Sequence, residues 1–200
     1  MSHEFAFIAA VALGVVLVEH ANGLRPRVAA AAFAASVAAM FGASALYHRV
    51  NWSPGHRRWM RRLDHAMIYG LIAGTYTPFG LLVLHGSWRI VVLAIVWTGA
   101  AAAVVLKLAW VDGPKWLAAV IGVGLGWAGV IVAAQLIHKI GASGFALLVA
   151  GGLAYTAGAV VYALRRPDPL PTLFGYHEIF HAVVIAAVAL QYSVVAFYVL

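Results

Sequence analysis

WRIVVLAIVWTGAAAAVVLKL, the sequence of residues 88–108, decides the fold of this chain. Its only charged side chains, Arg89 and Lys107, lie next to the two ends of the stretch. A helix over these residues extends about 31 Å, and the hydrocarbon core of a bilayer is about 30 Å thick. The stretch therefore predicts a transmembrane helix.

Six further apolar stretches of similar length occupy residues 4–20, 27–49, 63–84, 115–138, 143–164 and 176–200. Turn-forming residues separate them, including Gly23, Pro54, Gly113 and Gly141. Hydrophobic residues make up 64% of the chain and charged residues 10%, whereas soluble domains contain about 25% charged residues. We expect an all-α fold, a seven-transmembrane helix bundle, in which residues 1–200 form a single membrane domain.

The distribution of basic residues predicts the orientation of this bundle. No Lys or Arg precedes the first stretch, so we expect a retained helix rather than a cleaved signal peptide. Loops on the side of the N-terminus carry most of the basic residues, namely Arg49, Arg57, Arg58, Arg61, Arg62, Lys107, Lys115, Arg165 and Arg166. The opposite loops carry only Arg25, Arg27, Arg89 and Lys139. Because basic loops stay in the cytoplasm, we expect a multi-pass protein of the cell (inner) membrane with its N-terminus cytoplasmic and its C-terminus outside.

The net charge of +7 does not predict nucleic-acid binding, because the basic residues lie in short loops between apolar stretches. Residues 56–62 alternate basic side chains with Trp59 and Met60, which is typical of an anchor on anionic lipid. Membrane lipid is therefore the expected partner. Gly122 and Gly126 are spaced as GxxxG, which predicts close packing within the bundle, with a dimer interface as the alternative. The oligomeric state stays open, and the absence of cysteine excludes disulfides.

Ionisable residues at membrane depth are rare and usually functional. Here His48 ends the second stretch, Asp64 and His65 begin the third, and His177 and His181 begin the seventh. The predicted topology places these three helix ends at one level, near the cytoplasmic face. The remaining histidines are expected at the interface or in solvent, and they are His3, His20, His56, His85 and His138.

The spacing of these residues suggests a zinc site. His177 and His181 are four residues apart and share one helix face, and Ser44 lies one turn before His48. His177 and His181 form, together with His48, a set of three imidazoles that leaves a fourth position for water, the pattern of catalytic zinc. Asp64 is placed to accept a hydrogen bond from that water.

A second zinc interpretation uses residues 177–181, HEIFH, which match the H-E-x-x-H motif with Glu178 as general base. No Asp, Glu or His follows His181 in the sequence. A third ligand must then come from upstream, which favours His48. The roles of Glu178 and His65 stay open at this point.

The same residues resemble the haemolysin III family, part of the progestin and adipoQ receptor (PAQR) superfamily that includes the adiponectin receptors. The matching segments are SALYH at 44–48, LDHAMIY at 63–69 with GTYTP at 74–78, and GYHEIFH at 175–181. The resemblance implies seven helices with the N-terminus inside and the C-terminus outside. It also implies Zn²⁺ held by His48, His177 and His181, with Asp64 meeting the metal through a water and Ser44 lining the site.

The wider superfamily includes alkaline ceramidases. The leading expectation is therefore a zinc-dependent hydrolase of a lipid amide, ceramidase-like, acting near the cytoplasmic face. Asp64 would transfer the proton, and Ser44 would hold the water or the developing oxyanion. The alternatives are a non-catalytic receptor or lipid-homeostasis regulator with structural zinc, and a haemolysin-like membrane-active protein. Whether the chain is an enzyme, and on which substrate, stays open.

Overall fold

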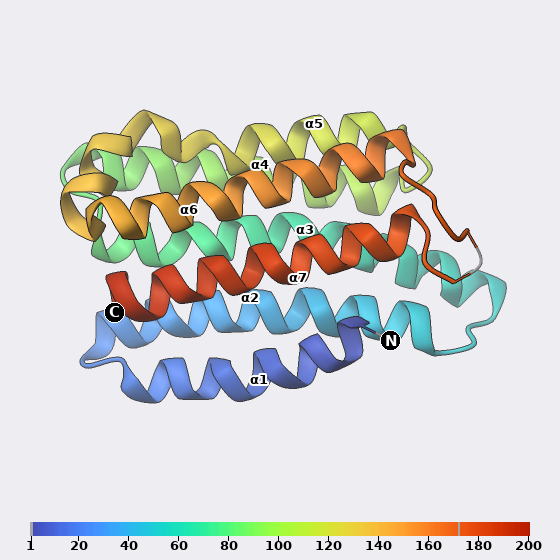
Figure 1. Cartoon of the computed structure of the whole chain (residues 1–200), viewed down its shortest axis with the longest axis horizontal. Coiled ribbons are helices and arrows are strands. Elements are labelled where there is room, and N and C mark those ends of the chain that lie inside the picture. Colours follow the sequence, from blue (N-terminus) through green and yellow to red (C-terminus); the bar gives the residue numbers. More distant parts are fainter. Residues whose placement is uncertain (1, 172) are drawn as a thin grey trace.

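The computed structural model describes residues 2–171 and 173–200, and within these ranges it is helical and contains no β-strand beyond an isolated bridge between Leu170 and Phe174 (Figure 1). The α-helices are α1 (Ser2–His20), α2 (Leu24–Arg49), α3 (Pro54–Leu82), α4 (Ser87–Ala109), α5 (Lys115–Gly126), α6 (Ala133–Leu164) and α7 (Tyr176–Val194). A 3₁₀ helix, η1 (Ala128–Val132), joins α5 to α6, and a π-helical turn, η2 (Val195–Val199), follows α7. The predicted all-α class is confirmed.

The helical stretch from Lys115 to Leu164 is interrupted at Gly141, where the sequence predicts a break. Gly141 has φ 70° and ψ 175°, a conformation outside the helical region. A positive φ is accessible to glycine because it has no Cβ. The chain reverses direction in this region, so the later part of α6 returns alongside α5 (Figure 1).

Helix α3 begins earlier than the sequence predicted, at Pro54 instead of Leu63. Proline suits the first turn of a helix, because its missing N–H would have no partner there. The basic residues expected in a loop therefore extend the helix. Two of them, Arg58 and Arg61, form ion pairs with Asp112 in the loop between α4 and α5.

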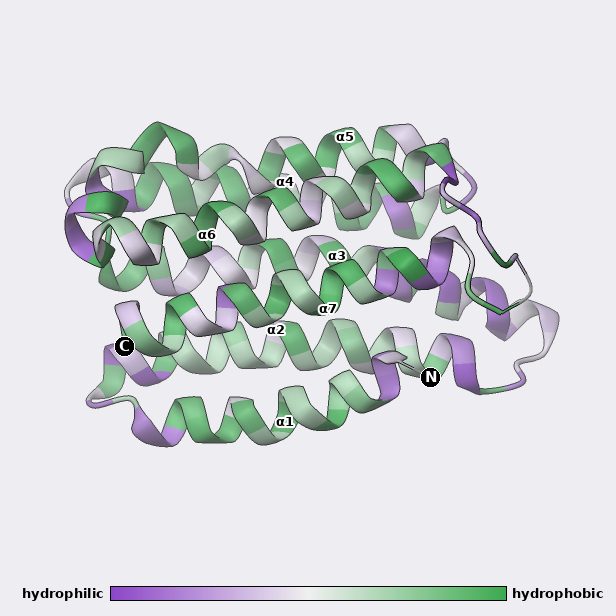
Figure 2. Ribbon diagram, viewed as in Figure 1, coloured by the Kyte–Doolittle hydropathy of each residue, from purple (hydrophilic) through white to green (hydrophobic). Residues whose placement is uncertain are grey.

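The exterior of the bundle is apolar, as lipid requires. On α1, Phe5 is 73% exposed and Ile8 is 65% exposed. Hydrophilic residues gather at the two ends of the bundle, and hydrophobic residues fill the length between them (Figure 2). Among the residues that the structure describes, five helical stretches are long and apolar enough to cross a membrane, namely Ser2–His20, Leu24–Arg49, Ser87–Ala109, Lys115–Leu164 and Tyr176–Val199.

The buried core draws residues mainly from α2, α3, α4 and α7, together with Leu136 and Ile140 of α6. On α4, Val92, Val96, Ala100 and Ala103 recur every three or four residues and are all buried, which is the period of one helix face. Phe33 of α2 is also buried in this core. Helix α3 packs along both α2 and α4, and α7 packs along α6. Helices α2, α3 and α7 carry the candidate site.

The expectation of close packing at the GxxxG glycines is wrong. A Cβ built at Gly122 would meet only Ile72, at 3.9 Å, and one at Gly126 would meet nothing within 4 Å. Both glycines instead line the apolar cavity that extends from the candidate site. Their small size leaves space inside the bundle rather than drawing two helices together.

Candidate metal centre

Three histidines from the ends of two helices converge at one end of the bundle. His48 lies in the last turn of α2, and His177 and His181 lie at the start of α7. Each offers a ring nitrogen, and the three nitrogens lie within 4.8 Å of one another. The Nε2 atoms of His48 and His177 are 3.3 Å apart.

The donor set and its spacing fit Zn²⁺. Imidazole binds zinc at about 2.0–2.1 Å, so two ligands of a tetrahedral ion are separated by roughly 3.3–3.4 Å. The separation of 3.3 Å between the Nε2 atoms of His48 and His177 matches this edge. His48 is exposed, whereas His177 and His181 are partly buried. The cluster is therefore open to the surroundings of the protein on the side of His48.

The start of α7 is fixed by a cap that involves Glu178, the residue that follows His177. The backbone N–H of Gly175 donates to Oε2 of Glu178 at 2.9 Å, as in a capping box. This bond orients the first turn of α7, on which His177 and His181 share one face. Glu178 thus acts as a cap, and the third histidine of the cluster comes from α2, as the spacing argument favoured.

Asp64 lies in α3 beside this cluster, and its side chain is 12% exposed. Its Oδ2 is 3.3 Å from Nδ1 of His65, and Ser44 and His48 are also neighbours of the carboxylate. Asp64, Ser44, His177 and His181 line the same cavity. The structure therefore brings the predicted carboxylate and hydroxyl to the histidines.

His65 connects α3 to α6. Its Nδ1 lies 2.8 Å from the carbonyl oxygen of Arg61, and its Nε2 lies 2.9 Å from the hydroxyl of Tyr162. A carbonyl can only accept, so Nδ1 carries a proton and Nε2 accepts from Tyr162 when the ring is neutral. The protonated Nδ1 also faces Asp64. His65 thus lies beside the carboxylate and links α3 to Tyr162 of α6.

His3 was not identified from the sequence as part of the site. It was expected at the interface or in solvent, yet it is 5% exposed and lies against the cluster. Its Nδ1 is 2.9 Å from Oγ of Ser44, and its ring stacks on that of His181 with centroids 3.8 Å apart. No spacing rule links residue 3 to residues 44 and 181, so only the packing of α1 reveals this contact.

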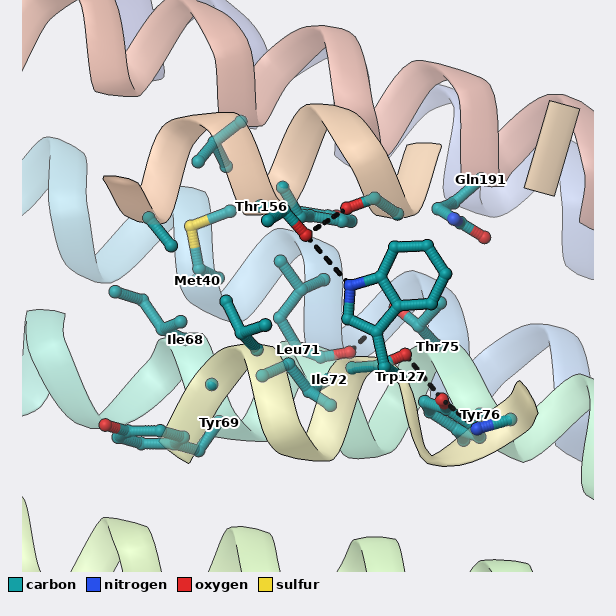
Figure 3. Close-up of a pocket in the computed structure, with 18 of the residues that line it drawn as sticks. Met40, Ile68, Tyr69, Leu71, Ile72, Thr75, Tyr76, Trp127, Thr156 and Gln191 are labelled. Carbon is teal, nitrogen blue, oxygen red and sulfur yellow. Dashed lines mark hydrogen bonds between the residues drawn. The ribbon is translucent and has the colours of Figure 1, made fainter. Parts of the chain in front are cut away.

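An apolar cavity of about 220 Å³ extends from the site into the bundle. Along α3 it is lined from Asp64 to Phe79, about 22 Å of helix. Figure 3 shows part of this lining, with apolar side chains such as Ile68 and Leu71 and the indole of Trp127. The indole N–H donates to Oγ1 of Thr156 at 2.9 Å, so this polar group is satisfied within the wall. The cavity therefore suits a long apolar chain whose polar end lies at the histidines.

Cations border the same end of the bundle. Nζ of Lys115 donates to the hydroxyl of Tyr176 at 2.8 Å and lies 4.4 Å from the centroid of the Tyr162 ring. In the loop after α4, the hydrogen bond and charge of Arg61 lower the pKa of Asp112, with Arg58 contributing in the same direction. Lys115, Arg58 and Arg61 therefore make this end of the bundle rich in positive charge.

Comparison with known proteins places the chain in a family. The sequence profile of the family described as Haemolysin-III related matches residues 1–192. A protein named Hemolysin-3 from Bacillus cereus is 32% identical over 203 residues, covering 100% of this chain and 90% of that protein. A Hemolysin-3 homolog from Bacillus subtilis is 31% identical over 169 residues, covering 83% and 75%. The Monocyte to macrophage differentiation factor of Homo sapiens is 23% identical over 201 residues, covering 96% and 79%. No solved structure matches.

With its apolar helices and the motifs gathered at one end of its bundle, the chain belongs to the haemolysin III family of multi-pass membrane proteins.

Proposed function

We propose that this protein is a zinc-dependent hydrolase of a lipid amide. One observation carries the proposal: three histidines that converge on a common point lie beside a carboxylate at the mouth of an apolar cavity. A hydrolytic zinc site needs an open position and a nearby proton acceptor. A membrane-embedded cavity of this kind selects a substrate with a long apolar chain.

Each residue has a role in this chemistry. His48, His177 and His181 hold the metal through neutral imidazoles. Zn²⁺, when bound, lowers the pKa of water to about 7 and polarises a carbonyl oxygen. Asp64 accepts a proton from water and returns it to the departing amine. Oγ of Ser44 donates a hydrogen bond beside the reacting carbonyl.

The apolar cavity fixes the orientation of the substrate. The acyl chain lies along α3 between Asp64 and Phe79, so the amide carbonyl stays at the histidines. The exposed face of His48 admits water and releases the amine. The site lies at the end of the bundle that the charge distribution predicts to be cytoplasmic.

A non-catalytic regulator is the second candidate. The three histidines come from α2 and α7, so a bound ion would tie together two helices far apart in the sequence. In that case Asp64→Asn leaves biological function intact, whereas removal of zinc lowers thermal stability.

The test uses purified, zinc-loaded protein in lipid nanodiscs with an N-acyl sphingoid lipid, and released fatty acid is quantified by mass spectrometry. We expect turnover by the wild type and a loss of about 10²–10⁴-fold in Asp64→Asn, the usual contribution of a general acid–base group. Glu19→Gln, which removes an exposed carboxylate at the other end of α1, is the matched control. Turnover by Asp64→Asn at the wild-type rate would refute the proposed role, and absence of turnover by the wild type would refute this substrate class.

A further inference from the structure

His3 makes three contacts at the site that the proposed function does not use. Its Nδ1 bonds to Oγ of Ser44 at 2.9 Å. Its ring lies 3.8 Å from that of His181, with the two planes 10° apart. The edge of Phe41 packs against it at 4.9 Å between centroids. All three partners come from other helices, two from α2 and one from α7.

Packing alone does not explain a histidine at this position. The only other residues of α1 that are buried are Gly14 and Leu17. Nε2 of His3 is buried without a hydrogen-bond partner of ordinary geometry, and an unsatisfied buried polar atom costs about 1–3 kcal/mol. An apolar side chain would fill the same space without that cost, so the imidazole has another reason to be there.

His3 is not a fourth ligand. The nitrogens that converge belong to His48, His177 and His181. The ring of His3 instead lies flat over the ring of His181, so the two rings present parallel faces rather than edges that meet at one point. Its influence on the site is exerted through its neighbours.

We propose that His3 is a positioning residue of the metal centre, which fixes the His181 ring by stacking and the Ser44 hydroxyl by hydrogen bonding. This inference rests on the proposed function, because it takes the three histidines as zinc ligands. The stack limits rotation of the His181 ring about its Cβ–Cγ bond, so that the nitrogen facing His48 and His177 keeps its direction. Groups that orient metal ligands by hydrogen bonding typically contribute a gain of about 10–100-fold in metal affinity, and we expect the stack to act on the same scale.

The hydrogen bond also sets the direction of the serine proton. A hydroxyl has one proton to donate, and a carboxylate can only accept. Whether Ser44 donates to its neighbour Asp64 in the free site or to the carbonyl of a bound substrate, its single proton is used, so Nδ1 of His3 must donate to Oγ of Ser44. His3 therefore carries its proton on Nδ1, and the first helix completes a chain of hydrogen bonds that runs through Ser44.

Two substitutions separate these roles. His3→Phe keeps an aromatic ring over His181 but loses the hydrogen bond to Ser44. His3→Asn keeps a polar group near the position of Nδ1 but loses the stack. His20→Ala is the matched control, because His20 lies at the other end of α1, is exposed, and bonds only to the carbonyl of Val16.

The measurements are the zinc dissociation constant of the purified full chain, from chelator competition, and the visible spectrum of the Co²⁺-substituted protein. We expect His3→Asn to bind zinc about 10–100-fold more weakly and to show an altered cobalt spectrum. His3→Phe and His20→Ala should retain the wild-type affinity and spectrum. If the smaller side chain of His3→Asn impairs folding, His3→Phe still tests the inference, because it preserves the packing.

The possible failures are distinct. Wild-type affinity and spectrum in His3→Asn would overturn the positioning role and leave the proposed function standing. Equal loss of affinity in His3→Phe and His3→Asn would overturn the role of the stack. Absence of zinc binding by the wild type itself would refute both the proposed function and this inference.

Discussion

At Gly74, α3 lies directly against α2, and its replacement tests how the site is held together. A Cβ built at Gly74 would overlap Oγ and Cβ of Ser36, and it would lie 3.2 Å from the carbonyl oxygen of Ala32. Neither neighbour is the flexible end of a long side chain. Gly74→Ala therefore forces α2 and α3 apart, and these helices carry His48 and Asp64.

The magnitude follows from a comparison within the same helix. Gly70 lies one turn earlier in α3, and a Cβ there would meet nothing within 4 Å. Both Gly→Ala changes gain up to about 1 kcal/mol of helix propensity, so their difference isolates the overlap. Overpacking costs about 1–3 kcal/mol, and 1 kcal/mol shifts the Tm of a chain of this size by about 2–4 °C. Gly74→Ala should thus melt roughly 2–12 °C below Gly70→Ala.

The assay is thermal unfolding of both variants in the same nanodiscs, without added metal. Ser36→Gly removes the overlapping atoms, so it should restore much of the stability lost in Gly74→Ala, with a coupling energy of at least about 1 kcal/mol. Equal melting temperatures for Gly70→Ala and Gly74→Ala would refute the packing argument, and so would the absence of rescue by Ser36→Gly.

Three further predictions concern the topology, the cap and the loop ion pair. The chain has no cysteine, so single-cysteine variants report the orientation of each loop directly. A membrane-impermeant maleimide should label Ser87→Cys but not Asn51→Cys in intact cells. The reverse labelling pattern would show that the predicted topology is inverted. Glu178→Ala removes the cap of α7, so it should lower the free energy of unfolding by about 1 kcal/mol and weaken zinc binding; unchanged zinc affinity would show that the cap does not orient the histidines. The pKa of Asp112 is lowered by Arg61, so the ion pair should persist as pH falls below about 3.9 and be lost only as the pH passes through the lowered pKa. A carboxyl NMR titration should show that pKa rising in Arg61→Ala, and an unchanged titration would contradict the pairing.

The sequence predicts the helical class and the helix face that His177 and His181 share, because both depend on local patterns. Runs of apolar residues give the helices, and the spacing of His177 and His181 gives one face of α7. The predicted topology then brings His48 to the same level. Gly141 was expected to break a helix, and it does so through its positive φ.

Other features depend on packing between distant segments, which composition and spacing do not encode. His3 looked like a terminal residue, yet the packing of α1 against α2 and α7 buries it beside His181. Gly122 and Gly126 have the spacing of a packing motif, but their neighbours leave room for the cavity. Because α3 begins early, at Pro54, basic residues that were predicted to lie in a loop lie on a helix.

The zinc content of the purified protein tests the central claim most directly. Wild-type protein isolated without chelators, analysed by elemental mass spectrometry, should contain about one zinc per chain, the stoichiometry of a single site with three histidines. His177→Ala and His181→Ala should lose the metal, whereas His138→Ala, an exposed histidine away from the cluster, should retain it. Zinc-free wild-type protein that takes up no zinc on loading, or full zinc content in both cluster variants, would contradict the account.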